Sequence, residues 1–103
     1  MLSVQYLDRT HRNVKESDGT LVLARGLLSG GTRATARFAK RIRKPCHVLD
    51  LNQHTMEGML ETTIAWLATH SIETLNIAGP RASADLGIQT VAEQLVAGLI
   101  RKN

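Results

Sequence analysis

Two adjacent glycines between an apolar run and a basic stretch mark the first residues that could do chemistry. The segment reads GLLSGGTRATARFAKRIRKP over residues 26–45. Glycines let a backbone approach an anion closely, and the free N–H groups at the start of a following helix attract negative charge. We therefore predict a phosphate-binding loop formed by four consecutive residues, Ser29, Gly30, Gly31 and Thr32.

Two further loops carry polar groups after apolar runs. Asp50 and Asn52 follow the second run, and a carboxylate about twenty residues past a glycine loop is where dinucleotide-binding folds hold a ribose hydroxyl. The third loop reads GPRASAD from residue 79, and its glycine permits a tight exit from the preceding run. An arginine and a hydroxyl there could bind phosphate, so the candidate ligand-binding residues of this loop are Gly79, Pro80, Arg81 and Ser83.

Each of these signals has a structural alternative. Two glycines also make an ordinary tight turn, Asp50 could cap the loop that follows it, and Arg81 could be a surface side chain. The basic residues after the glycines could form a solvated helix face. The four histidines lack metal-ligand spacing, and the single cysteine, Cys46, reads as a buried, inert residue, so we predict neither a metal site nor catalytic residues.

The elements that must position these loops alternate along the chain. Apolar runs predict strands at Thr20–Ala24, Cys46–Leu51 and Thr74–Gly79, and helical periodicity follows each of them. A short amphipathic helix is predicted from Val4 to Glu16. This alternation is typical of an α/β fold, and we expect a three-layer Rossmann-like sandwich with a short parallel sheet of three strands.

Composition limits the kind of protein. A chain of 103 residues fits one domain, so we assign residues 1–103 to a single Rossmann-like domain. The net charge of +4 and the pI of about 9.8 suit an anionic partner. One cysteine indicates a reducing compartment, and no apolar run approaches the ~20 residues of a membrane span. We expect a cytoplasmic protein without a membrane partner.

Four segments carry a resemblance to a known family. SDGTL, SGGT, KPCHVLDL and AGPR occur in this order. Together they resemble the putative molybdenum carriers, a circularly permuted branch of the SLOG superfamily of Rossmann-like nucleotide-binding proteins, over nearly the whole chain. Members usually begin with a further strand and a glycine loop of the type GGQTG. This chain has no such segment and looks like the C-terminal two thirds of a typical member.

The resemblance implies a strand order. Numbered along the chain, the three predicted strands would lie in the order 2-1-3, so the loops at Ser29–Thr32 and Gly79–Ser83 would face each other across the ligand crevice. The third strand would then be an open edge, and an open edge invites another chain. A surplus of apolar surface on the final helix, predicted from Leu86 to Arg101, points the same way, and we expect a homodimer.

Three functions remain open from the sequence. The first is a module that binds a nucleotide or another small phosphorylated ligand. The second is a nucleotide-processing hydrolase of the lonely-guy type, but residues 19–49 contain no Asp or Glu, and Arg37 stands about where that family has its glutamate. The third, from the family's name, is a carrier of molybdate or another oxyanion, or of molybdenum cofactor. Nucleic acid is not an expected partner, because only Tyr6, Phe38 and Trp66 are available for stacking.

Overall fold

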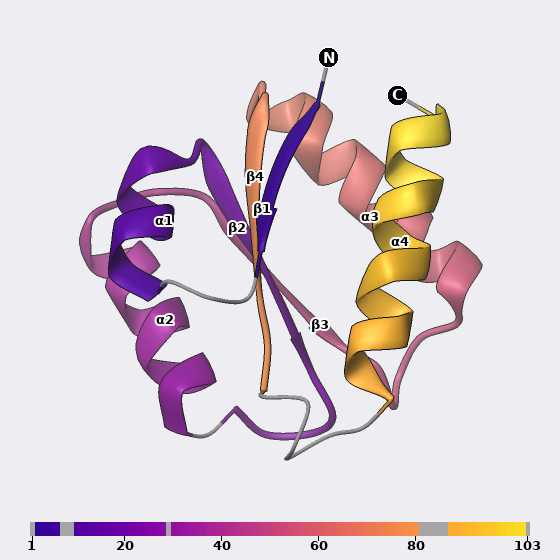
Figure 1. Ribbon diagram of the computed structural model, residues 1–103, viewed down its shortest axis with the longest axis horizontal. Coiled ribbons are helices and arrows are strands. Elements are labelled where there is room, and N and C mark those ends of the chain that lie inside the picture. The colour runs from indigo at the N-terminus through magenta and orange to yellow at the C-terminus, as the bar shows by residue number, and fades with distance from the viewer. Residues whose placement is uncertain (1, 7–9, 29, 81–86, 103) are drawn as a thin grey trace.

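The computed structural model describes residues 2–6, 10–28, 30–80 and 87–102, without the side chains of residues 5, 6, 10, 11 and 102. Strands and helices alternate, and the sheet lies between two helical layers, with α1 and α2 on one face and α3 and α4 on the other (Figure 1). The elements are β1 (Ser3–Tyr6), α1 (Thr10–Glu16), β2 (Gly19–Ala24), α2 (Gly30–Arg41), β3 (Cys46–Asp50), α3 (Met56–Thr69), β4 (Thr74–Ala78) and α4 (Ile88–Lys102). This confirms the α/β sandwich.

The sheet is parallel, and its strands lie in the order β1-β4-β2-β3. The three strands predicted from the sequence are β2, β3 and β4, and their predicted relative order is confirmed. The predicted number of strands is wrong, because β1 adds a fourth strand beside β4.

The N-terminal segment accounts for that error. The predicted helix from Val4 is wrong for residues 4–6, which pair with β4 from Ser3↔Thr74 to Tyr6↔Ile77. The helix proper begins at Thr10, and residues 7–9 lie outside the described part of the chain. The prediction that β4 forms an open edge is therefore also wrong, and the sheet ends at β1 and β3.

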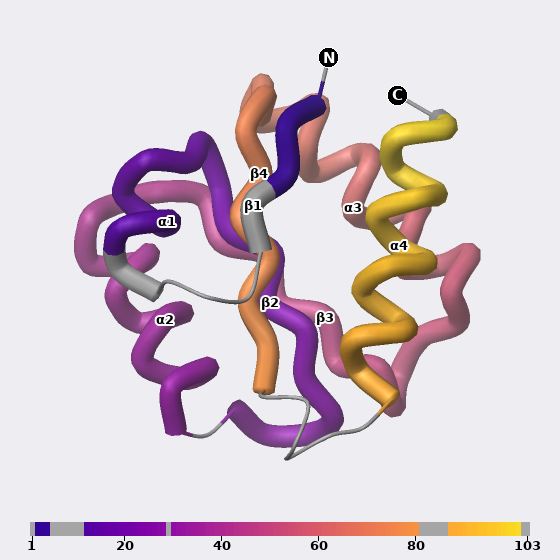
Figure 2. Tube along the Cα trace, viewed as in Figure 1, coloured from indigo at the N-terminus to yellow at the C-terminus, as the bar shows by residue number. Residues whose placement is uncertain are grey.

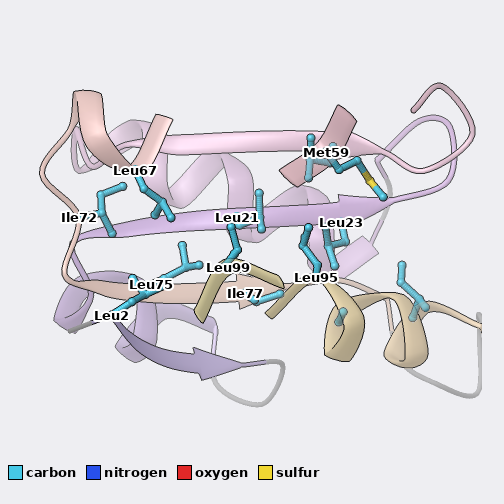
Figure 3. Close-up of a cluster of buried hydrophobic side chains, with 13 residues drawn as sticks. Leu2, Leu21, Leu23, Met59, Leu67, Ile72, Leu75, Ile77, Leu95 and Leu99 are labelled. Carbon is cyan, nitrogen blue, oxygen red and sulfur yellow. The ribbon is translucent and has the colours of Figure 1, made fainter. Parts of the chain in front are cut away.

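The main hydrophobic core lies between the sheet and the α3–α4 layer (Figure 3). Alternate residues of the central strands, such as Leu21 and Ile77, point to this side and are fully buried. The helical period predicted for the last helix is confirmed, because α4 contributes four buried residues to the same cluster. They are Ile88, Ala92, Leu95 and Leu99. This side alone brings together most of the large apolar side chains, so it supplies most of the hydrophobic stabilisation.

The opposite face of the sheet, under α1 and α2, is smaller and more polar. Thr20 of β2 and Asn76 of β4 are both buried there, and the Asn76 amide donates to the Thr20 hydroxyl at 3.4 Å. The buried side chains that α2 contributes are Thr32, Thr35 and Ala39. Small and polar contacts of this kind hold α2 close to the sheet with little apolar area.

Two side chains close the amino edge of the sheet. One carboxylate oxygen of Asp18 accepts hydrogen bonds from the backbone N–H groups of Glu73 and Thr74, at 3.0 and 2.8 Å. The Lys44 ammonium donates to the carbonyls of Lys15 and Ser17, both at 2.6 Å, at the C-terminal end of α1. Asp18 of the SDGTL segment thus has a structural role, at the edge opposite the predicted ligand loops.

None of the described helices has the length and apolar character needed to cross a membrane.

Candidate anion-binding site at the carboxyl edge of the sheet

The parallel sheet brings three loops to one edge of the molecule. The carboxyl ends of β2, β3 and β4 lie at the same end, together with the N-termini of α2 and α4 (Figure 2). The described site residues that the sequence predicts all lie there: Gly30, Gly31, Thr32, Asp50, Gly79 and Pro80. Ser29, Arg81 and Ser83, the other predicted ligand residues, lie outside the described part of the chain.

The start of α2 has the geometry of an open anion-binding turn. Gly30 has φ +54°, a left-handed conformation that side chains with a Cβ adopt at a cost. Apart from its chain neighbours and its own helix backbone, a Cβ added at Gly31 would have no atom of the described residues within 4 Å, so packing does not require a glycine at this position. The first N–H groups of a helix have no partner within the helix. The α2 start therefore offers donors at an uncrowded surface, and its first turn has no acidic residue to repel an anion.

The Thr32 side chain is held in the packing of α2 on the sheet. Its side chain is 9% exposed and belongs to the layer that packs α2 on the sheet. Its hydroxyl is therefore poorly placed for a ligand in solvent, and its backbone N–H, in the first turn of α2, is the group that can contribute. Thr35, one turn later, is buried as well and donates its hydroxyl to the Gly31 carbonyl at 2.9 Å.

Asp50 braces two loops. One of its carboxylate oxygens accepts a hydrogen bond from the backbone N–H of Gly26 at 2.9 Å and another from that of Asn52 at 3.0 Å. These two bonds, with Gly26 first, hold the carboxyl pKa below its ordinary value near 3.8. The capping alternative for Asp50 is thus realised, and the second carboxylate oxygen is the one that a ribose hydroxyl would have to use.

The end of β4 approaches β2 closely. A Cβ added at Gly79 would lie 3.1 Å from the carbonyl oxygen of Leu23. That distance is tighter than a side chain accepts easily, so the tight exit predicted at Gly79 has a packing reason. Pro80, the next residue, is half-buried. The loops after β2 and β4 therefore leave the sheet next to each other.

The structure also shows residues that the sequence reasoning missed. Gly26 has φ +78° and supplies the N–H that Asp50 binds, and Leu27 beside it is 96% exposed. A glycine shortly after a strand, with a carboxylate at the tip of the neighbouring strand, is a signal for such a brace. The sequence analysis considered only the later pair of glycines.

Groups that could ligate a metal are not gathered in the described residues. No cluster of three or more His, Cys, Asp or Glu side chains occurs among them. The Cys46 thiol is half-buried, and burial raises its pKa, which keeps it protonated. His47 stacks on Trp66 with ring centroids 5.4 Å apart, so its ring serves the packing of β3 on α3.

The basic residues after the glycines divide into two groups. Arg33, Arg37 and Lys40 of α2 are exposed, as the solvated-face alternative requires. Lys44, another of the basic residues after the glycines, instead donates hydrogen bonds to the carbonyls at the C-terminal end of α1. The exposed cations of α2 extend from the glycine turn along the helix.

Comparisons with known proteins agree with this fold. A model of the circularly permutated YpsA SLOG family matches residues 1–100. The crystal structure of a putative molybdenum carrier protein from Syntrophus aciditrophicus SB superposes with a TM-score of 0.85 and 40% sequence identity over 88% of this chain. The chain spans 58% of the length of that protein. No curated protein matches the chain. The family model and the identity of this structural relative together show that the chain belongs to the circularly permutated YpsA SLOG family.

Proposed function

We propose that this protein binds a nucleotide or another small phosphorylated ligand at the carboxyl edge of its sheet. The observation that carries the proposal is the start of α2. There a glycine in the left-handed conformation is followed by Gly31, around which space is open. A phosphate placed against this turn would receive backbone N–H donors and the positive end of the helix dipole.

The surroundings support the same class of ligand. Asp50 fixes the Gly26 loop, and Gly79 lets the β4 exit lie against β2. These contacts bring two loop exits next to the α2 turn before any ligand arrives, which lowers the ordering cost of binding. Arg81, predicted to make a charge-assisted bond to phosphate, follows the β4 exit in sequence.

An oxyanion such as molybdate is the second candidate, because the structural relative is named a putative molybdenum carrier protein. The described residues do not fit a directly ligated molybdenum ion, since they contain no cluster of His, Cys, Asp or Glu. An oxyanion would instead use the same backbone N–H groups as a phosphate. The two candidates therefore share one site and differ in the size of the ligand.

Isothermal titration calorimetry with AMP, ATP, inorganic phosphate and molybdate tests the proposal. We expect Gly31→Phe to weaken binding about tenfold or more by blocking close approach, while Gly31→Ala has a smaller effect. Circular dichroism of both variants should match that of the parent, because the added Cβ meets no atom of the described residues beyond its own stretch of helix within 4 Å. Arg81→Ala should weaken the same ligand by about 1.5–3 kcal/mol.

The outcomes separate the candidates. Nucleotide binding that exceeds phosphate and molybdate binding supports the first proposal, and molybdate binding alone supports the second. Unchanged affinity in a folded Gly31→Phe variant would show that the α2 turn is not the site. An absence of binding by all four compounds would overturn both candidates.

A further inference from the structure

The positive charge of this chain is concentrated on one helix and its flanks. Seven of the 13 Lys and Arg residues lie between residues 25 and 44, and residues 19–49 include no Asp or Glu. Outside residues 19–49 the acidic residues outnumber the basic ones. The charge of the protein is therefore distributed unevenly, with an excess of cations along α2.

A hollow lies on the surface of α2. Its volume is about 670 Å³, and its described lining consists of Ala34, Arg37, Phe38, Lys40 and Arg41. All three cations are exposed. The hollow is open to solvent, whereas sites for small molecules enclose most of their ligand. An extended partner suits this surface better than a compact one.

The order of the cations suits a chain of phosphates. Arg33, Arg37 and Arg41 follow one another at intervals of four residues, which is a rise of about 6 Å along a helix. Neighbouring phosphates on a single nucleic-acid strand are separated by a comparable distance. Arginine also binds phosphate through two parallel hydrogen bonds, which gives it an advantage over lysine at such sites.

An aromatic ring lies within the same surface. Phe38 is half-buried, and the Arg41 guanidinium lies 5.6 Å from the centre of its ring. Bases of single-stranded nucleic acid stack on aromatic rings and on guanidinium planes without regard to sequence. An acidic peptide could also use the cations, but a base can stack on the Arg41–Phe38 pair whereas a carboxylate cannot, so this pair favours nucleic acid.

We propose that the exposed face of α2 binds single-stranded nucleic acid through its phosphates, at a site separate from the glycine turn. The proposal departs from the expectation drawn from the sequence, which counted stacking aromatic residues. A surface that binds mainly through phosphates needs few rings, and the contacts of Arg33, Arg37 and Arg41 carry the affinity. Binding is expected to be non-specific, with dissociation constants of about 10⁻⁴–10⁻⁶ M at physiological salt.

Fluorescence anisotropy with a dye-labelled oligothymidylate tests the proposal through its salt dependence. Three phosphate contacts predict that log K falls with log salt at a slope of about −2, since each contact on a single strand contributes about −0.7. The double variant Arg37→Ala/Arg41→Ala should reduce the slope to about −0.7 and weaken binding. The matched control is Arg12→Ala/Arg101→Ala, which removes the same charge from exposed positions on α1 and α4 and should leave the slope nearly unchanged.

Two further measurements decide between the alternatives. The first is competition between polyglutamate and the oligonucleotide at equal charge concentration. Competition by polyglutamate that binds no more tightly than the oligonucleotide fits a shared cation surface. Tighter binding of polyglutamate would overturn the proposal in favour of an acidic protein as the partner. Equal loss of oligonucleotide binding in the α2 and control variants would show that net charge, and not the α2 surface, causes binding, and would overturn the proposal. Absence of binding at low salt would also overturn it. Gly31→Phe should leave oligonucleotide binding intact, so this surface is tested independently of the glycine turn.

Discussion

The carboxylate of Asp50 accepts a hydrogen bond of 2.9 Å from the backbone N–H of Gly26, and this contact joins the tip of β3 to the loop after β2. The same oxygen also binds the N–H of Asn52. Asp50 therefore fixes the shape of the segment that leads to the glycine turn of α2. A residue in this place can affect a ligand directly, or only through the loops that it holds.

Replacement of Asp50 by alanine distinguishes the two roles. If Asp50 acts by bracing the loop, Asp50→Ala should weaken inorganic phosphate and AMP by a similar factor, of about tenfold. If it binds a ribose hydroxyl, AMP should weaken while phosphate does not. We expect the first result, because both hydrogen bonds of Asp50 in the structure are to backbone groups. Parallel titrations by calorimetry measure both affinities.

Asp18 provides the control for that experiment. Its carboxylate also accepts two backbone N–H groups, but at the amino edge of the sheet. Asp18→Ala should lower the free energy of unfolding by about 1 kcal/mol, or the melting temperature by about 4–8 °C, without changing either affinity. A loss of affinity in Asp18→Ala equal to that in Asp50→Ala would mean that both act through general destabilisation.

These two aspartates show what a sequence can and cannot predict about the site. Asp50 is recognisable as a strand-tip carboxylate, because the apolar run before it and the polar residues after it are local signals. Its partner is not local. The bond to Gly26 depends on the pairing of β3 with β2, which places Asp50 beside Ala24. The alternation of strands and helices predicts that strands pair in a parallel sheet, but not the register that places Asp50 beside Ala24.

The N-terminal strand shows the same limit for the fold. The central strands β2 and β4 were predictable, because they are short apolar runs buried among other elements. Residues 3–6 lack that composition, and the spacing of Tyr6, Leu7, Thr10 and Val14 fits a helix. They form β1 because β4 offers a row of backbone groups to pair with. Pairing with β4 thus makes a strand of a segment whose own residue pattern favours a helix.

Acid should destabilise the protein in two steps. His47 is partly buried, its Nε2 atom has no hydrogen-bond partner, and the pKa of its ring is lowered from about 6.5 by burial and, secondarily, by His54. Between the lowered and the ordinary pKa the unfolded chain binds more protons than the folded one, so stability falls as pH drops below about 6.5. Asp18 and Asp50 have lowered pKa values, so their contribution is present above about pH 4 and is lost as pH falls through those values.

The variant His47→Phe isolates the first step. A phenyl ring preserves the stack against Trp66 but does not titrate. Melting temperatures measured between about pH 7.5 and pH 5.5 should fall less in this variant than in the parent. An identical fall in both proteins would assign the first step to another group.

Hydrolysis of nucleotides between base and ribose is not expected from this chain. That reaction needs a carboxylate near the glycine turn, to stabilise positive charge developing on the ribose or to activate water. The first turn of α2 has no acidic residue, and one carboxylate oxygen of Asp50 already accepts two backbone N–H groups. Chromatography of AMP incubated with the protein should show no free adenine above background. Release of adenine that disappears in Asp50→Asn would contradict this prediction.

We predict that the protein forms a homodimer through β3. Since β1 covers β4, the strand edge first expected to pair is closed, and β3 is left at the other end of the sheet (Figure 1). Its five residues include no Lys and no Pro, the residues that commonly protect an edge, and Val48 at its centre is 45% exposed. The last helix is a weaker candidate than its sequence suggests, because Leu95 and Leu99 are fully buried within the chain itself.

Sedimentation at micromolar concentration should give about twice the 11.3 kDa mass of the chain. Val48→Lys places a charge at the centre of the exposed edge and should give a monomer with nearly unchanged circular dichroism. Ile100→Lys is the matched control, because Ile100 is 55% exposed on α4, far along the chain from β3, and its replacement should leave the dimer intact. Dissociation by Ile100→Lys but not by Val48→Lys would show that the dimer interface lies on α4. A monomeric parent protein would show that β3 remains unpaired in solution. Leu95→Asp cannot serve as the test, since a charge at a fully buried position would unfold the chain before it could report on association.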